Sequence, residues 1–256
     1  MGDSPLLVSI PHDGHLLAPG MAARMTSAAR ALPDSDWHVR RLYEFARTLD
    51  ASFLVATYSR YVVDLNRPPS DASLYDGQVS TGLCPRETFA GDRIYVEEQD
   101  CTEIERRERV KAFWKPYHSV LDSELLRIRD KFGYALLWDA HSIRSEIPNL
   151  FIGKLPDLNI GTNNGATCHS LLERKIVSIA ESSRFSWVLN GRFKGGYITR
   201  TYGTPAQKIH AMQLELSQKC YMNEDTLLYD EHSADKLIHV LKDMLKQYMQ
   251  LANTLH

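Results

Sequence analysis

The sequence predicts an α/β fold, in which helices pack on both faces of a central sheet. Short β-rich runs alternate along the chain with longer segments of helical period, which is the pattern of such folds. The chain has 256 residues, of which 43% are hydrophobic, and this is enough to bury one large core. We therefore expect a single domain over residues 1–256.

Short apolar segments predict the strands of the sheet. In chain order these segments are residues 6–10, 53–57, 61–65, 134–138, 187–190, 197–200 and 210–216. Residues 68–85 and 149–167 are rich in Pro, Gly, Asn, Asp and Ser, so we expect both to be loops.

Three longer segments carry the apolar spacing of a helix. The first covers residues 37–49, with Asp36 in position to cap its start. The second covers residues 103–132 and ends at Gly133. In the third, apolar residues from Leu237 to Met249 recur at alternating spacings of three and one positions and so form a single apolar stripe. This spacing predicts a helix packed on the core.

Composition excludes several classes of function. The chain has 30 basic and 32 acidic residues, and a net charge of -2 gives no overall field to attract nucleic acid or an anionic membrane. Neither a long apolar span nor a basic, apolar leader is evident. Four cysteines without a Cys-x-x-Cys pair indicate neither a disulfide scaffold nor a zinc ribbon. We expect a cytoplasmic protein.

Polar residues follow two of the predicted strands. His12 comes just after the first strand, and Asp64, Asn66 and Arg67 lie at the end of the third. In open α/β sheets, ligand sites lie beyond the carboxyl ends of strands. A guanidinium beside an amide suits a carboxylate, which accepts two parallel hydrogen bonds from the planar group. An ion pair between Asp64 and Arg67 that closes a turn is the alternative, and a lone His12 is ordinarily a loop residue.

Two further strands carry acids beside other polar groups. Asp139 and His141 are two residues apart on an extended segment and therefore point to the same side. Carboxylates orient histidines in this way in many zinc sites. Glu215 lies within the strand predicted at 210–216, on the face opposite Leu214. If that face is solvated, Glu215 needs no function, so the pattern leaves both readings open.

Together these residues resemble a known family. The chain is similar to the N-formylglutamate amidohydrolases, or deformylases, of histidine breakdown, through SIPHDG, DWHVRRLY, YSRYVVDLNRP, LWDAHSIRSEIPNLF, LPDLNIGTNNGATC, LNGRFKGGYITRTYG and HAMQLELSQ. It resembles the aspartoacylases and zinc carboxypeptidases more distantly, through residues 64–67 and 139–141. The wider resemblance implies a three-layer sandwich, with a mixed sheet between helical layers and one zinc at the strand ends.

The family resemblance implies a zinc-dependent amidohydrolase that cleaves N-formyl-L-glutamate to formate and L-glutamate. His12 and His141 are the implied imidazole ligands of one Zn²⁺ per chain, although other divalent ions are compatible with these residues. The third ligand stays open, because His15 stands where the wider His-x-x-Glu pattern has its glutamate. Asp36 is the preferred third ligand, since a carboxylate suits zinc. His15 is the second choice, and Asp36 acting only as a helix cap is the alternative.

The resemblance also implies roles for the remaining polar residues. Glu215 would take a proton from water and return it to the leaving nitrogen, and Arg144 would face the oxyanion. The substrate is a small dicarboxylate, so two cationic sites are needed. Asn66 and Arg67 are expected to hold one carboxylate. The candidates for the other carboxylate and for neutral donors are Arg144, Arg192, Arg200, Asn163 and Asn164.

Two rival functions use the same residues. A related zinc amidase for N-succinyl or N-acetyl amino acids would share every catalytic group and differ in pocket volume. A non-catalytic protein that binds acyl amino acids would bind its ligand without a metal. One zinc per chain together with metal-dependent hydrolysis would distinguish an enzyme from such a binding protein. The oligomeric state is not predictable from this sequence.

Overall fold

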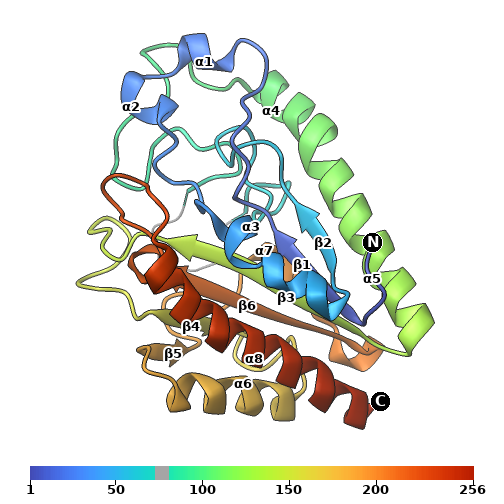
Figure 1. Cartoon of the computed structure of the whole chain (residues 1–256). Coiled ribbons are helices and arrows are strands. Elements are labelled where there is room, and N and C mark those ends of the chain that lie inside the picture. Colours follow the sequence, from blue (N-terminus) through green and yellow to red (C-terminus); the bar gives the residue numbers. More distant parts are fainter. Residues whose placement is uncertain (73–80) are drawn as a thin grey trace.

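A six-stranded sheet forms the centre of the molecule (Figure 1). The computed structural model describes residues 1–72 and 81–256. The strand order across the sheet is β2-β1-β3-β6-β4-β5. The strands are β1 Leu6–Ile10, β2 Ser52–Val55, β3 Ala135–Ile143, β4 Leu158–Gly161, β5 Trp187–Leu189 and β6 Ile209–Ser217.

The sheet is mixed, with one block of parallel strands. β1 is parallel to both β2 and β3, and β3 is parallel to β6. β4 is antiparallel to β6, and β5 runs parallel to β4. Because β1, β3 and β6 run in the same direction, their carboxyl ends lie at the same edge of the sheet. His12, His141 and Glu215 lie at or near this edge.

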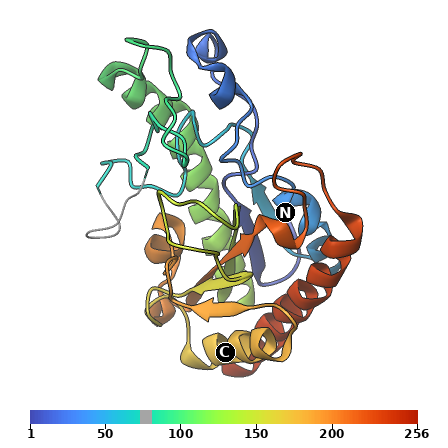
Figure 2. The ribbon, with the colours of Figure 1, turned by 90° about the vertical axis from the view of Figure 1, so that its left-hand side faces the viewer.

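Different helices cover the two faces of the sheet (Figures 1 and 2). On one face, α5 (Lys115–Phe132) packs around Leu137 of β3. On the other face, α6 (Ser170–Ser182) and α8 (Glu231–Leu255) pack around Trp138. Both faces of β3 are therefore buried, which explains the unbroken apolar run at its start. The expected three-layer α/β sandwich is confirmed.

The helix expected at 103–132 is also confirmed. It consists of α4 (Glu103–Arg109), a π-helical turn η2 (Val110–Trp114) and α5 in direct succession. The Thr102 side chain accepts a hydrogen bond from the backbone N–H of Glu105 at the start of α4. Gly133 ends α5 with φ of 84°, a left-handed conformation that glycine adopts without strain.

The shorter helices lie mainly in the connections. They are α1 Met21–Arg24, α2 Ser27–Arg30, α3 Val39–Leu42, α7 Tyr197–Tyr202 and the 3₁₀ turns η1 Glu44–Leu49, η3 Pro205–Gln207 and η4 Gln218–Cys220. The single helix expected at 37–49 is therefore divided between α3 and η1. Its apolar spacing still places Val39, Leu42 and Ala46 in the core, which is why the pattern suggested one helix.

Two of the expected strands are wrong. Residues 61–65 form turns and irregular backbone, because their polar groups bond to other partners: Asp64 N–H donates to Leu83 O, and the Arg109 side chain donates to Val62 O. Residues 197–200 lie in α7. The Asn66 side chain accepts from the Ile198 N–H, so a residue far away in sequence satisfies one of the free N–H groups at the start of this helix.

Sequence patterns also missed some element limits. The strand expected at 134–138 continues to Ile143, so Asp139 and His141 lie inside β3. Within the expected loop 149–167, β4 forms a strand of 4 residues. Of the loop expected at 68–85, residues 73–80 lie outside the described part of the chain. Within residues 1–72 and 81–256, no helix has both the length and the apolarity needed to cross a bilayer.

Candidate active site

The carboxyl edge of the parallel strands brings distant polar side chains together. His12 follows β1, while His141 and Glu215 are neighbours in the register between β3 and β6. All three side chains are buried. The ring centroids of His12 and His141 are 4.9 Å apart, although 129 positions separate them in sequence (141 minus 12). The strand directions thus create a compact polar centre inside the protein.

His12, Asp36 and His141 form a group that is suited to a metal ion. One ligand atom from each residue lies within 4.8 Å of the others. Asp36 Oδ2 is 3.2 Å from His141 Nδ1 and 3.7 Å from His12 Nδ1. Asp36 Oδ1 is buried and lacks a hydrogen-bond partner in the described structure. A buried acceptor without a donor fits a cation site, and two imidazoles with a carboxylate are a donor set that zinc takes.

Other acids face the far nitrogen of each ring. His12 Nε2 is 2.8 Å from Asp64 Oδ1, and His141 Nε2 is 3.2 Å from Asp139 Oδ1. At His12, the Asp64 carboxylate holds the proton on Nε2 and leaves Nδ1 available for a metal. His141 Nε2 also lies 3.1 Å from the Asn66 amide nitrogen, which is a hydrogen-bond donor. Asp64 does not form the ion pair with Arg67 that was the alternative for it. Its carboxylate instead pairs with His12 and Arg60.

Arg60 is a buried cation that the sequence interpretation missed. Its Nη2 atom is 2.6 Å from Asp64 Oδ2, and its Nη1 atom is 3.7 Å from Asp36 Oδ1. The guanidinium lies 4.7 Å from the centroid of the Phe89 ring. Its Nε atom is buried and has no hydrogen-bond partner among the described residues. An arginine directly before the apolar run 61–63 is itself a signal, since a buried arginine needs acidic partners.

Burial and charge act against each other on the ionisable groups of this site. Burial raises the pKa of Asp36, but the adjacent His12 and His141 hold it below the usual value. Burial lowers the pKa of His141, but Asp139 and Asp36 raise it well above the usual value. Burial raises the pKa of Glu215 to about 8, because it disfavours the charged carboxylate. Burial therefore favours the protonated form of Glu215.

A cavity of about 60 Å³ lies in front of these groups. The residues expected in the site that line it are His12, Asn66, Arg67, His141, Arg192 and Glu215. Its apolar wall is formed by Phe89, Ile143, Leu150 and Phe193. The cavity thus combines guanidinium groups with an apolar wall, which suits a small anionic ligand with an aliphatic chain.

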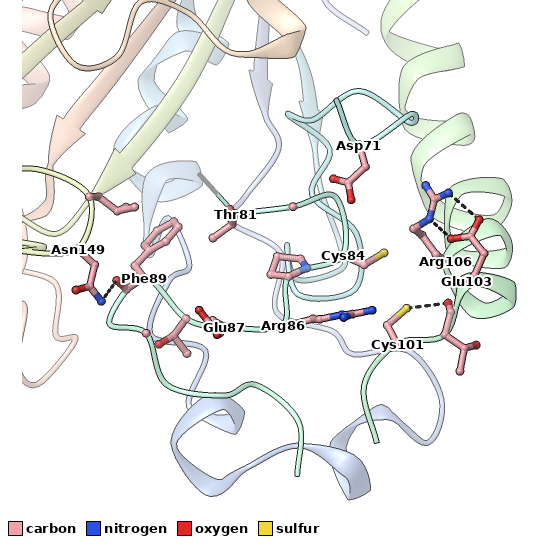
Figure 3. A pocket seen from close by; sticks show the side chains of 16 residues that line it. Asp71, Thr81, Cys84, Arg86, Glu87, Phe89, Cys101, Glu103, Arg106 and Asn149 are labelled. Atoms are coloured by element: carbon pink, nitrogen blue, oxygen red, sulfur yellow. Dashed lines mark hydrogen bonds and ion pairs between the residues drawn. The ribbon is translucent and has the colours of Figure 1, made fainter. Parts of the chain in front are cut away.

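A larger cavity of about 600 Å³ adjoins the small one (Figure 3). Thr81, Phe89 and Leu150 line both cavities. Asn149 Nδ2 donates to the backbone carbonyl of Phe89 at 3.3 Å, which ties this shared wall to the segment after β3. The shared wall places the polar centre next to a much wider space.

Two neighbours support the polar groups of the small cavity. Gln213 Oε1 accepts from the Gly196 N–H at 2.6 Å, and Gln213 Nε2 donates to Glu215 Oε2 at 3.3 Å. A Cβ atom on Gly196 would lie 2.2 Å from Asn66 Nδ2, so only glycine allows this approach. Gln213 shares a strand face with Glu215, and this is the sequence signal that could have identified it.

Among the residues expected to act in catalysis or to bind substrate, Arg144, Arg200, Asn163 and Asn164 do not line the small cavity. Arg144 Nη2 contacts Asp225 Oδ1 at 3.2 Å in an exposed ion pair. Arg200 Nε donates to Gly195 O at 2.7 Å. Asn163 has φ of 49° and shapes a turn. The spacing of Arg144 after His141 suggested a shared site, but β3 ends at Ile143 and the chain then turns away.

The structure also separates the candidates for the third ligand. The His15 side chain is 42% exposed, and its ring packs on Trp37 at 4.3 Å, so it stands outside the group of His12, Asp36 and His141. Asp36 does not cap a helix, because the residue before α3 is His38 and the Asp36 carboxylate instead accepts from the Ser142 N–H at 3.0 Å. Asp36 therefore reaches β3 from the loop before α3.

Comparisons with known proteins give a consistent result. Residues 4–222 match the family model of N-formylglutamate amidohydrolase. The chain is 51% identical to the N-formylglutamate deformylase of Pseudomonas putida, over 96% of this chain and 92% of that protein. It is 48% identical to the N-formylglutamate deformylase of Pseudomonas aeruginosa, over 97% of this chain and 94% of that protein.

Solved structures share the fold at lower identity. The crystal structure of an N-formylglutamate amidohydrolase from Ralstonia eutropha JMP134 matches with a TM-score of 0.80 and 21% identity, over 99% of this chain and 95% of that one. A gene product of Agrobacterium tumefaciens matches with a TM-score of 0.69 and 21% identity, over 96% of this chain and 91% of that one. These likenesses concern the arrangement of the sheet and its helices.

Proposed function

The chain belongs to the N-formylglutamate amidohydrolase family, and we propose that it hydrolyses N-formyl-L-glutamate to formate and L-glutamate with the help of a bound divalent metal ion. The observation that carries the metal dependence is the buried group His12, Asp36 and His141, whose ligand atoms lie within 4.8 Å. The names of the relatives favour a formyl group over succinyl and acetyl groups. A buried base beside this group favours an enzyme over a binding protein.

We assign the metal to His12, Asp36 and His141, and we favour one zinc ion per chain. When bound, such an ion makes water more acidic and polarises a carbonyl group. Asp64 would hold the proton on Nε2 of His12, so that Nδ1 of this ring keeps its lone pair free for the ion. The His141 ring is placed by the Asn66 amide nitrogen, 3.1 Å from Nε2, and its Nδ1 lies 3.2 Å from Asp36 Oδ2.

Glu215 is the proposed acid–base group. It would accept a proton from the attacking water and then give that proton to the leaving amine nitrogen, which needs protonation before the amide bond breaks. Burial raises the pKa of Glu215 to about 8. A group that must first accept and then donate a proton works best when its pKa lies near the operating pH. The Gln213 amide holds the carboxylate in place from the same strand face.

Arg60 is better placed than Arg144 to face the oxyanion. Arg60 lines the small cavity and has a buried Nε without a described partner, whereas Arg144 is turned toward Asp225. A fixed cation in a site closed to water stabilises developing negative charge more strongly than it would in water. We therefore assign the oxyanion contact to Arg60.

Arg67 and Arg192 are the proposed partners of the two substrate carboxylates. Both line the small cavity and come from different parts of the chain. Arg67 Nε donates to Thr81 O at 2.9 Å, and Arg192 Nε donates to Leu150 O at 3.0 Å, so backbone carbonyls fix the direction of both guanidinium groups. Asn66 stands beside Arg67. Its Oδ1 accepts from the Ile198 N–H and its Nδ2 lies 3.1 Å from His141 Nε2, so we assign the second N–H of the amide to the same carboxylate.

Arg67→Ala should raise the KM for N-formylglutamate by at least about tenfold, because hydrogen bonds to charged groups contribute about 1.5–3 kcal/mol. The kcat should change much less, because the carboxylate is bound in the substrate and in the transition state alike. Steady-state formate release measures both values. Arg144→Ala is the matched comparison and should alter neither by more than about twofold. An unchanged KM in Arg67→Ala would remove this residue from the substrate site.

The proposed function is tested by formate release from N-formylglutamate before and after treatment with a chelator. We expect release by the untreated protein, loss after chelation and recovery when Zn²⁺ is added back. N-acetylglutamate and N-succinylglutamate serve as comparison substrates and should react much more slowly. Full activity in protein shown by elemental analysis to hold no metal would refute the metal dependence, and a preference for a larger acyl group would refute the substrate.

A further inference from the structure

Two buried side chains of the helix formed by α4, η2 and α5 (residues 103–132) hold the backbone on either side of Asn66. Trp114 Nε1, at the end of the π-helical turn, donates to Arg67 O at 2.9 Å. His118 Nε2, one turn later in α5, lies 2.9 Å from Leu65 O. The two rings stack on each other with 3.8 Å between their centroids. The carbonyls before and after Asn66 are thus bound by one aromatic pair.

The partners of His118 fix its proton. A carbonyl only accepts hydrogen bonds, so Nε2 of His118 carries the hydrogen that points to Leu65 O. The other nitrogen, Nδ1, is 2.9 Å from the Tyr202 hydroxyl, which can donate to it. Burial lowers the pKa of His118 to about 4, so the ring stays neutral at physiological pH. Both ring nitrogens of His118 therefore have a hydrogen-bond partner.

The segment needs these donors because it is not part of the sheet. Backbone carbonyls that lack a ladder partner must find other donors when they are buried. Three side chains of the helix at 103–132 provide them. Arg109 binds the carbonyls of residues 61 and 62, His118 binds that of residue 65, and Trp114 binds that of residue 67. A π-helical turn closes through i to i+5 bonds, which suits the five-residue step from Arg109 to Trp114.

The same aromatic pair reaches the start of α7. The Tyr197 ring lies 5.7 Å from the Trp114 ring and 5.5 Å from the His118 ring, measured between centroids. The backbone of Tyr197 donates to Asn66 O at 3.4 Å, and Ile198 N–H donates to Asn66 Oδ1 at 2.8 Å. The backbone carbonyl and the Oδ1 atom of Asn66 are consequently held by the first residues of α7, while its Nδ2 lies 3.1 Å from His141 Nε2.

We propose that Trp114 and His118 are positioning residues for substrate binding, because they fix the backbone of residues 65–67 and thereby aim the amide of Asn66 and the guanidinium of Arg67 into the cavity. This inference rests on the proposed function, which assigns those two groups to a substrate carboxylate. Asn66 has little room to adjust, because the backbone of Gly196 packs directly against its amide. Loss of a carbonyl partner should therefore misdirect the carboxylate-binding groups.

His118→Phe and Trp114→Phe test the proposal, because each keeps a stacked ring and removes the hydrogen-bond donor. We expect KM for N-formylglutamate to rise by about fivefold to tenfold in each, with kcat within about twofold of wild type, the pattern expected when binding common to substrate and transition state is weakened. His118→Gln restores an N–H donor and should recover part of the loss in KM. Amide hydrogen exchange of residues 64–67 should be faster in both Phe variants than in wild type.

Tyr248→Phe is the matched control. It also removes a buried hydrogen bond to a backbone carbonyl, that of His210 at 3.1 Å, but in α8 on the other face of the sheet. It should lower the melting temperature without changing KM. If the Phe variants lose stability in the same way but keep the wild-type KM and the wild-type exchange at residues 64–67, the proposal is overturned. His118→Gln and Trp114→Phe decide the question if His118→Phe does not fold.

The hydrogen exchange also separates this proposal from the proposed function. A wild-type protein that releases no formate would refute the function, whereas exchange at residues 64–67 is measured without substrate. Unchanged exchange in both Phe variants would refute the positioning role whatever the substrate is. Faster exchange with unchanged KM would also refute it, because the segment would then be held without any consequence for binding.

Discussion

Glu215→Gln should lower kcat for formate release by about 10²–10⁴-fold, the range that positioned acid–base groups contribute. Glutamine has nearly the same shape as glutamate, so the buried cavity keeps its volume. It cannot accept a proton from water or return one to the leaving nitrogen. The metal content should stay at the wild-type level, because Glu215 is not part of the group formed by His12, Asp36 and His141. Steady-state kinetics and elemental analysis of the purified variant measure the two quantities.

Glu124→Gln is the control for this substitution. Glu124 is also buried, but it lies in α5, where it accepts from Ser52 and pairs with Arg127. We expect Glu124→Gln to lower stability and to leave kcat unchanged. A Glu215→Gln variant with wild-type kcat would exclude Glu215 as the base. A variant that loses its metal would instead make Glu215 a ligand.

Because both faces of the central sheet are buried, several of its strands could be predicted from their apolar residues. β1 has the expected limits, and β6 extends the expected strand by one residue at each end, because their apolar runs reflect helices on both sides of the sheet. The segments 61–65 and 197–200 have similar composition but do not form strands. Their backbone groups bond to side chains that are distant in sequence, such as Arg109 and Asn66, and no local pattern contains that information.

The candidate site was predictable to the extent that strand direction determines it. His141 and Glu215 meet because β3 and β6 are parallel, and the sequence already placed both residues near strand ends. Arg60 escaped notice because the run that follows it suggested a strand. Arg144 was expected in the site from its spacing after His141 alone, and the turn after β3 directs it to Asp225 instead. Loop conformation therefore decided which cations enter the cavity.

Asp36→Asn should weaken metal binding by more than about 100-fold, since replacing a group that only orients a ligand already costs about 10- to 100-fold. Asparagine keeps the size of the side chain and can still accept from the Ser142 N–H, so the loop before α3 should hold its place. What disappears is the negative charge between His12 and His141. Zinc titration against a competing chelator measures the affinity, and excess Zn²⁺ should restore part of the formate release.

Asp34→Asn distinguishes a ligand from any other buried acid in this loop. Asp34 is also buried and lies two residues before Asp36, but its carboxylate accepts from the Tyr61 hydroxyl at 2.7 Å and from the Phe89 N–H at 2.9 Å. We expect Asp34→Asn to keep wild-type zinc affinity and to lose only stability. Equal zinc affinity in Asp36→Asn and wild type would mean that the carboxylate serves the loop alone, and the third ligand would then have to come from another residue.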